Sequence, residues 1–275
     1  CGTVAWPVPP VSPPVSEDPA PISTAAPSQT PAVAWSIGTS IASIGITGAS
    51  AILGAVLLAA VLTAAFGRSY VLSHVLLVNI LAYQFLVLGV VISAVWLVFG
   101  YGHAGPAALG YRFPGWQTLS TAVLAGAAAV FLGSVLVTTI FNTLFPQYGL
   151  HGNAKEVLAG VHHHMPIVVR VLTVLWAGVE APLAEETLFR GIIYQGLRHY
   201  FDERLDSVVA IFLAAVSSGL LFGLAHFEPK TLPILFLVGI VLAYVFQYGR
   251  SIYASALVHG ILNASVAIYV LQSTG

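Results

Sequence analysis

The sequence contains very few charged residues. Its 275 residues include 10 acidic and 9 basic ones, together 7% of the chain, whereas 58% are hydrophobic. A soluble globular protein of this length needs more charge than this to solvate its surface. The net charge of −1 comes without a basic cluster, which excludes the phosphate-binding surface of a nucleic-acid-binding protein. The composition therefore predicts an integral membrane protein.

Cysteine is almost absent. The single cysteine, Cys1, excludes an internal disulfide and a CxxC-type metal site. The chain begins Cys1-Gly2, as a bacterial lipoprotein does after its signal peptide is removed at the lipid-modified cysteine. One interpretation is that Cys1 is lipidated, and the other is that the chain boundary is arbitrary.

Basic residues are missing from residues 1–31, which hold 9 of the 16 prolines and two acids. Such a segment buries too little apolar surface to offset the entropy lost on ordering, so we predict an extended or disordered tail. If the tail is ordered, contact with a partner membrane subunit is the simplest explanation.

Long apolar runs fill the remainder of the chain. About 20 such residues, rising ~1.5 Å each, cross a hydrocarbon core of about 30 Å. We therefore predict an all-α, polytopic integral membrane protein with seven or eight helices and no strand. N-terminal transmembrane helices occupy residues 32–145, and a helical core occupies residues 146–275. The expected helices are 40–66, 71–99, 117–141, 165–199, 205–226, 230–248 and 251–272, and Pro182 should kink the fourth.

One short run interrupts this apolar pattern. Residues 185–190, Glu-Glu-Thr-Leu-Phe-Arg, put three charges into six positions. Three unneutralised charges at the centre of a bilayer would cost about 8–10 kcal/mol. Glu186 and Arg190 lie four residues apart with the acid first, which allows them to pair on one helix face. Pairing makes the burial of both tolerable.

Two further helices carry polar or aromatic pairs at the same spacing. Phe222 and His226 lie near the end of one helix, and His259 and Asn263 lie on the last. In lipid, such faces should turn inward and meet. We therefore predict one polar interior that the three helices share.

These side chains suit acid–base hydrolysis. A glutamate near histidine can take a proton from water, while histidine or asparagine stabilises the oxyanion. Glu185 is the better candidate base because Glu186 is tied to Arg190. Alternatively, the same glutamate and histidine side chains could ligate a divalent metal that activates water. The sequence leaves both mechanisms open.

The sequence lacks the motifs of other classes of intramembrane protease. There is no HExxH zinc motif, and Asp18, Asp202 and Asp206 fall outside the confident spans, which argues against an aspartyl pair. Ser217-Ser218-Gly219 fits ordinary helix packing better than a serine nucleophile. The histidine run 162–164 is interpreted as a solvated loop rather than a metal site.

The set Glu-Glu-x-x-x-Arg at 185–190, Phe-x-x-x-His at 222–226 and His-x-x-x-Asn at 259–263 resembles the CAAX prenyl protease and bacteriocin-processing (Abi) family of intramembrane endopeptidases. The likeness covers roughly residues 165–270. It implies an all-helical membrane core that cleaves a peptide bond with activated water.

The resemblance also implies a role for each motif residue. Glu185 would be the base and His226 its partner, while His259 and Asn263 would stabilise the oxyanion. Glu186 and Arg190 would hold the geometry. The residues before 165 carry no recognisable family motif.

Alternative functions are an accessory or scaffold subunit that retains a protease-like core, and a transporter with a polar intramembrane relay. We expect a bacterial inner-membrane location with the N-terminus outside, because the tail lacks basic residues and Arg68 follows the first span. The expected partners are membrane lipid and a peptide or protein substrate.

Overall fold

The computed structural model describes residues 35–100, 105–144 and 166–273. Every described residue belongs to one compact unit. The proline-rich tail, its predicted lipid at Cys1, its predicted partner contact and the histidine run at 162–164 lie outside the described residues.

All regular elements in the described ranges are helices, which confirms the predicted all-α class. They are α1 (Ile37–Phe66), α2 (Arg68–Ser73), α3 (Val75–Gly100), the 3-10 turn η1 (Pro106–Leu109), α4 (Trp116–Leu144), α6 (Ile167–Leu175), the π-helical η2 (Trp176–Glu180), α7 (Ala181–Glu186), the π-helical η3 (Thr187–Tyr194), α8 (Gln195–Asp202), α9 (Ser207–Leu224), α10 (Leu232–Gly249) and α11 (Ile252–Ser273).

Seven of the described helical stretches are long and apolar enough to cross a membrane, and the fourth runs continuously from α6 to α8. Their apolar side chains remain exposed on outer faces, such as Ile52, Leu53 and Leu57 on α1. In a bilayer such faces contact lipid, where exposure of apolar surface carries no penalty. The polytopic membrane architecture predicted from the sequence is therefore confirmed.

The second span begins later than predicted. The chain first forms the short helix α2, which ends at Ser73, and α3 starts at Val75 after His74, so the predicted start at residue 71 is wrong. His74 has φ −121° and ψ 33°, which breaks the helix, and its Nδ1 lies 2.9 Å from the carbonyl oxygen of Tyr70. A local side chain–backbone hydrogen bond thus competes with continuation of the helix.

The fourth span departs from regular α geometry on both sides of Pro182. Pro182 lies in the first turn of α7, and π-helical turns precede and follow that helix. Proline lacks the N–H that an internal helical residue donates, and wider π turns accommodate such a disruption. The π turns therefore bracket the two glutamates, which end α7.

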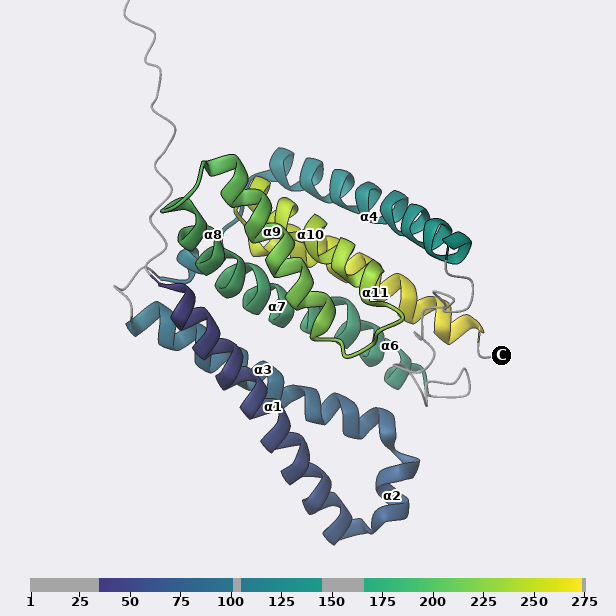
Figure 1. Cartoon of the computed structure of the whole chain (residues 1–275). Helices are drawn as coiled ribbons and strands as arrows, with labels where there is room; N and C mark the ends of the chain where they lie inside the picture. The colour runs from purple at the N-terminus through teal and green to yellow at the C-terminus, as the bar shows by residue number, and fades with distance from the viewer. Residues whose placement is uncertain (1–34, 101–104, 145–165, 274–275) are drawn as a thin grey trace, which may run out of the picture. The chain divides into compact units, whose positions relative to one another are not determined.

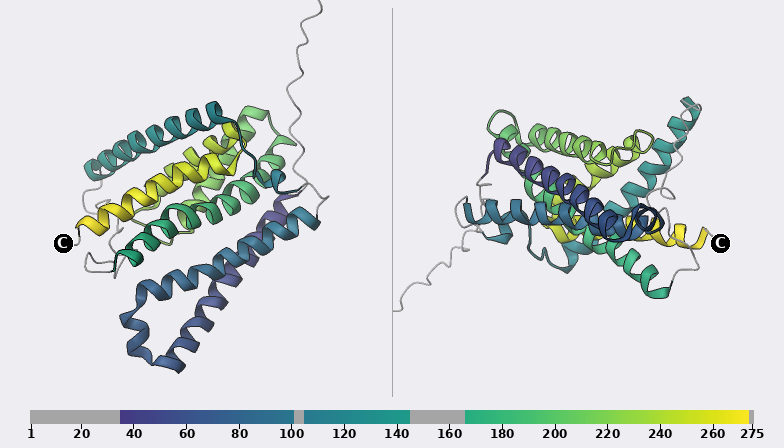
Figure 2. Two further views of the ribbon diagram at one scale, coloured as in Figure 1. Left: turned by 180° about the vertical axis from the view of Figure 1, so that it is seen from behind. Right: turned by 90° about the horizontal axis from the view of Figure 1, so that it is seen from below.

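The inner helices pack closely. α10 contacts α9, α4 and α11, while α1 lies beside α3 (Figures 1 and 2). A Cβ at Gly239 of α10 would lie 2.6 Å from the Cα of Gly219 in α9, and a Cβ at Gly260 of α11 would press on the carbonyl oxygen of Gly178 in η2. Glycine permits both approaches, as in other membrane helix pairs. Because Gly260 follows His259, the second approach brings His259 towards the glutamate-bearing span.

Candidate active site

Glu186 and Arg190 form the ion pair predicted from their spacing. Arg190 Nη1 donates to Glu186 Oε1 at 2.9 Å, and both side chains are fully buried. The second guanidinium nitrogen donates to the carbonyl oxygen of Gly239 at 2.9 Å, and the Phe222 ring lies 4.8 Å from the guanidinium carbon. A buried charge is tolerated only when it is paired and hydrogen-bonded in this way.

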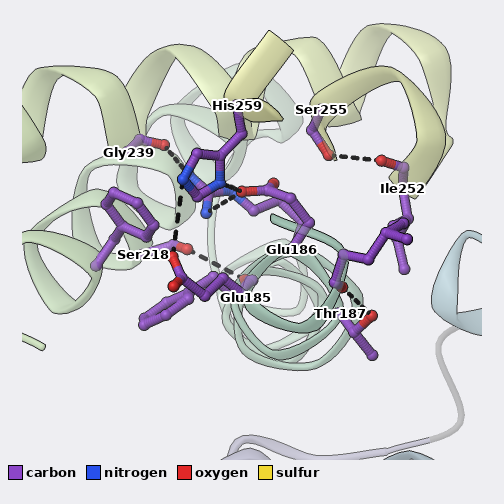
Figure 3. A network of polar contacts seen from close by, with 12 residues as sticks. Glu185, Glu186, Thr187, Ser218, Gly239, Ile252, Ser255 and His259 are labelled. Atoms are coloured by element: carbon purple, nitrogen blue, oxygen red, sulfur yellow. Dashed lines mark hydrogen bonds and ion pairs between the residues drawn. The ribbon is translucent and has the colours of Figure 1, made fainter. Parts of the chain in front are cut away.

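His259 joins this pair from α11. Its Nδ1 lies 3.1 Å from Glu186 Oε1, the same oxygen that accepts from Arg190 (Figure 3). Because an ionised carboxylate can only accept, Nδ1 carries the hydrogen and donates it. In the neutral imidazole, Nε2 is then the unprotonated nitrogen. Glu186 therefore fixes both the orientation and the tautomer of His259.

Asn263 lies one helical turn after His259 on the same face. Its amide nitrogen is 3.2 Å from His259 Nε2 and donates to that nitrogen in the neutral tautomer. The side chain of Asn263 is partly buried. The two residues of the third motif thus contact each other as well as the glutamate-bearing span.

Glu185 has a different environment from its neighbour. Oε1 accepts a hydrogen bond from the hydroxyl of Tyr83 at 3.0 Å. Oε2 is buried without a hydrogen-bond partner and lies 3.8 Å from His259 Nε2. The side chain is 17% exposed, whereas that of Glu186 is fully buried. Oε2 of Glu186 also lacks a hydrogen-bond partner, so the exposed fraction of the side chain is what distinguishes Glu185 from Glu186.

His226 occupies a separate position. It lies in the turn after α9 rather than within the predicted helix 205–226, and its side chain is exposed. Its Nδ1 lies 2.8 Å from the carbonyl oxygen of Phe222, and its ring is 4.8 Å from the Phe222 ring. The Phe222 ring in turn lies 5.5 Å from the His259 ring. The structure thus brings five of the six predicted site residues together and places His226 beyond Phe222.

The described side chains of this site are not arranged to ligate a metal ion. Among the described residues, no three His, Cys, Asp or Glu side chains converge closely enough to hold a metal ion. Glu186 already accepts from Arg190, whose positive charge would repel a divalent cation. Catalytic zinc sites use three protein ligands, and within the described ranges this site offers Glu185 and His259 besides the paired Glu186.

Ser218 supports the packing interpretation of the serine pair. It is fully buried, and its hydroxyl donates to the carbonyl oxygen of Phe189 at 3.2 Å (Figure 3). A hydroxyl engaged with a backbone carbonyl of the neighbouring helix ties the two helices together.

Tyr83 is the site residue that the sequence interpretation missed. It belongs to α3, far from the three motifs, yet its hydroxyl contacts Glu185. A signal was available, because Tyr83 and Gln84 are adjacent hydrogen-bonding residues inside an apolar span, and such residues turn towards other helices.

An apolar groove of about 1050 Å³ opens beside the site, between α2 and the start of α3 on one side and α6 and η2 on the other. Its wall includes Trp176 and Glu180. The Trp176 ring packs edge-on against Tyr83 with centroids 5.5 Å apart. The groove thus ends next to the residue that contacts Glu185.

Comparison with known proteins points to the same helices. Residues 167–265 match the family model described as type II CAAX prenyl endopeptidase Rce1-like. The membrane-embedded CAAX protease MroQ of Staphylococcus aureus (strain USA300) is 23% identical over 148 residues, which cover 54% of this chain and 57% of MroQ. The match therefore spans little more than half the length of this relative. No solved structure matches the chain.

The family match covers the part of the chain that holds the three motifs. The matched range runs from the start of α6 to two residues beyond Asn263, and it contains all three motifs. Residues 167–265 of this chain are therefore similar to the Rce1-like CAAX prenyl endopeptidases, which agrees with the resemblance seen in the three motifs.

Proposed function

We propose that this protein is an intramembrane endopeptidase in which Glu185 takes a proton from a water molecule that attacks a peptide carbonyl. The observation that carries this proposal is the environment of Glu185. One oxygen is held by Tyr83, and the other has no hydrogen-bond partner and faces His259 Nε2 at 3.8 Å. Glu186 also has an oxygen without a hydrogen-bond partner, Oε2, but its side chain is fully buried and its Oε1 accepts from both Arg190 and His259.

The gap between Glu185 Oε2 and His259 Nε2 suits a water molecule. At 3.8 Å the two atoms are too far apart for a direct hydrogen bond. A water between them can donate to Oε2 at about 2.8 Å, while the lone pair of Nε2 accepts from the Asn263 amide. A water held there has a carboxylate within reach of its proton, as general base catalysis requires.

Asn263 supplies a donor for the oxyanion. In the neutral tautomer His259 Nε2 is an acceptor, so His259 can donate to an oxyanion only as the imidazolium. The Asn263 amide nitrogen, 3.2 Å from Nε2, is a donor in either state. A single such donor contributes about 100- to 1000-fold in kcat.

The proposed reaction is a balanced hydrolysis. Glu185 accepts a proton from water as the water oxygen bonds to the peptide carbon, and the carbonyl oxygen becomes the oxyanion. The peptide C–N bond then breaks, and the nitrogen takes the proton back from Glu185. The products are a carboxylic acid and an amine, and Glu185 is again ionised.

For the substrate we propose a peptide with a prenylated CAAX end, because the family model describes a CAAX prenyl endopeptidase and MroQ is described as a CAAX protease. The apolar groove beside Trp176 offers about 1050 Å³ for its hydrocarbon chain. We also infer a bacterial cell-membrane location, with the segment before α1 outside and Arg68, directly after α1, inside.

The test compares wild-type protein with Glu185→Gln in liposomes, using an internally quenched peptide that ends in a farnesylated CAAX sequence. We expect cleavage by the wild type and loss of at least about 100-fold in kcat for Glu185→Gln, with an unchanged melting temperature. Glu203→Gln, which alters an exposed acid at the end of the same span, is the matched control.

Two results would reject the proposal. Equal cleavage by wild type and Glu185→Gln would remove Glu185 as the base. No cleavage by the wild type, together with stable co-purification of another membrane protein, would favour the accessory-subunit alternative.

A further inference from the structure

Tyr83 contributes to the site from outside the family-matched range. It lies on α3, whereas the match begins at residue 167. Its hydroxyl is 3.0 Å from Glu185 Oε1 and 3.4 Å from the carbonyl oxygen of Ala181. A phenol has one hydrogen to donate, and a carboxylate is a stronger acceptor than an amide carbonyl. The shorter contact is accordingly the one to Glu185.

The Tyr83 ring is held on a second side. Trp176, in the π-helical turn η2, packs edge-on against it at 5.5 Å between centroids. Such an edge-to-face pair adds about 0.5–1.5 kcal/mol beyond simple burial. The ring that carries the hydroxyl is therefore held between α3 and the glutamate-bearing span.

This contact distinguishes the two oxygens of Glu185. With Oε1 occupied by Tyr83, the carboxylate cannot rotate freely, and Oε2 is directed to His259 Nε2 at 3.8 Å. Without the hydroxyl, either oxygen could turn towards the water, and the carboxylate would sample orientations that do not reach it. The hydrogen bond therefore selects one reactive geometry.

We propose that Tyr83 is a positioning residue for Glu185, so that α3, a helix without a family motif, completes the catalytic site. This inference rests on the proposed function. Tyr83 does not touch the reacting atoms, and it acts through the orientation of Glu185.

The first measurement is steady-state cleavage of the quenched farnesyl-CAAX peptide by full-length protein in liposomes. We expect Tyr83→Phe to lower kcat by roughly 10- to 100-fold, as for loss of a hydrogen bond to a charged group. KM and the melting temperature should stay unchanged, because the ring and its packing against Trp176 remain. In the Glu185→Gln background the same substitution should cause no further loss.

Tyr194→Phe is the matched control. It also removes a hydroxyl from a tyrosine in the helical interior, in this case one that donates to Gln247 Oε1 at 2.9 Å, away from Glu185. Its kcat should stay within about twofold of the wild type. An equal loss of kcat in both variants would mean a general structural effect and would overturn the inference.

A second measurement needs no substrate. Infrared difference spectra of wild type and Glu185→Gln identify the carboxyl band of Glu185, and Tyr83→Phe should shift that band. An unshifted band overturns the Tyr83 inference whatever the cleavage data show. If Glu185→Gln is inactive but Tyr83→Phe keeps the wild-type kcat, the Tyr83 inference alone fails. If Glu185→Gln is fully active, both the proposed function and the Tyr83 inference fail.

Discussion

His259 and Glu186, 73 positions apart in sequence, are joined by a hydrogen bond of 3.1 Å between Nδ1 and Oε1. The bond links α11 to the end of α7 inside a fully buried environment. It makes Glu186 a shared acceptor for a guanidinium and an imidazole. The acid that pairs with Arg190 thus also fixes the histidine of the third motif, and its removal should affect more than one helix.

Glu186→Gln should destabilise the protein strongly. The amide cannot balance the positive charge of Arg190, and breaking a buried ion pair costs about 3–5 kcal/mol. The measurement is reversible unfolding in detergent micelles. Glu203→Gln is the control, because Glu203 and Arg204 form an exposed pair, which is worth about 0–1 kcal/mol. Similar losses for both variants would contradict a buried, energetically important pair.

His226→Gln should leave stability nearly unchanged and reduce activity. The exposed ring contacts only its own helix end through Phe222 in the described contacts, so the loss in stability should be below about 0.5 kcal/mol. The family resemblance assigns His226 as the partner of Glu185, and loss of such a group lowers kcat by about 100-fold or more. Cleavage of the farnesyl-CAAX peptide measures the effect.

His199→Gln provides the control for His226→Gln. His199 is also a histidine at a helix end, partly exposed, with Nε2 3.5 Å from Glu203 Oε1. It belongs to no motif and does not line the apolar groove. Full activity of His226→Gln would remove His226 from the mechanism.

Chelation should leave cleavage unchanged. The site lacks a third metal-ligating side chain among the described residues, and Glu186 already forms an ion pair with Arg190. Purified protein treated with a strong chelator and dialysed should keep its kcat within about twofold. Loss of activity that returns with a single added divalent metal would instead support the metal-dependent mechanism that the sequence left open.

The predictable features are those set by local pattern. The spans follow from the length of apolar runs, and the Glu186–Arg190 pair follows from i,i+4 spacing. A tyrosine inside an apolar span indicates a side that faces other helices, but the contact of Tyr83 with Glu185 depends on how α3 packs against α7, which no local pattern encodes. The exposed position of His226 was missed because α9 ends two residues before it. The π turns around Pro182 likewise depend on tertiary packing, since proline alone predicts only a kink.

Gly260→Ala should separate α11 from η2. The added methyl group would press on the carbonyl oxygen of Gly178, and neither backbone can move without shifting its helix. Overpacking of this kind costs about 1–3 kcal/mol. Because His259 precedes Gly260, the shift should also lengthen the contact from His259 to Glu186 and lower kcat.

Gly45→Ala on α1 is the matched control for this substitution. A Cβ at Gly45 meets no atom within 4 Å, and alanine favours the helix by about 1 kcal/mol over glycine. We therefore expect Gly45→Ala to keep wild-type activity and equal or higher stability in thermal unfolding and peptide cleavage. If Gly260→Ala behaves in the same way, close approach at Gly178 is not needed to hold His259 against Glu186, because the helices can then take up a methyl group without moving the site.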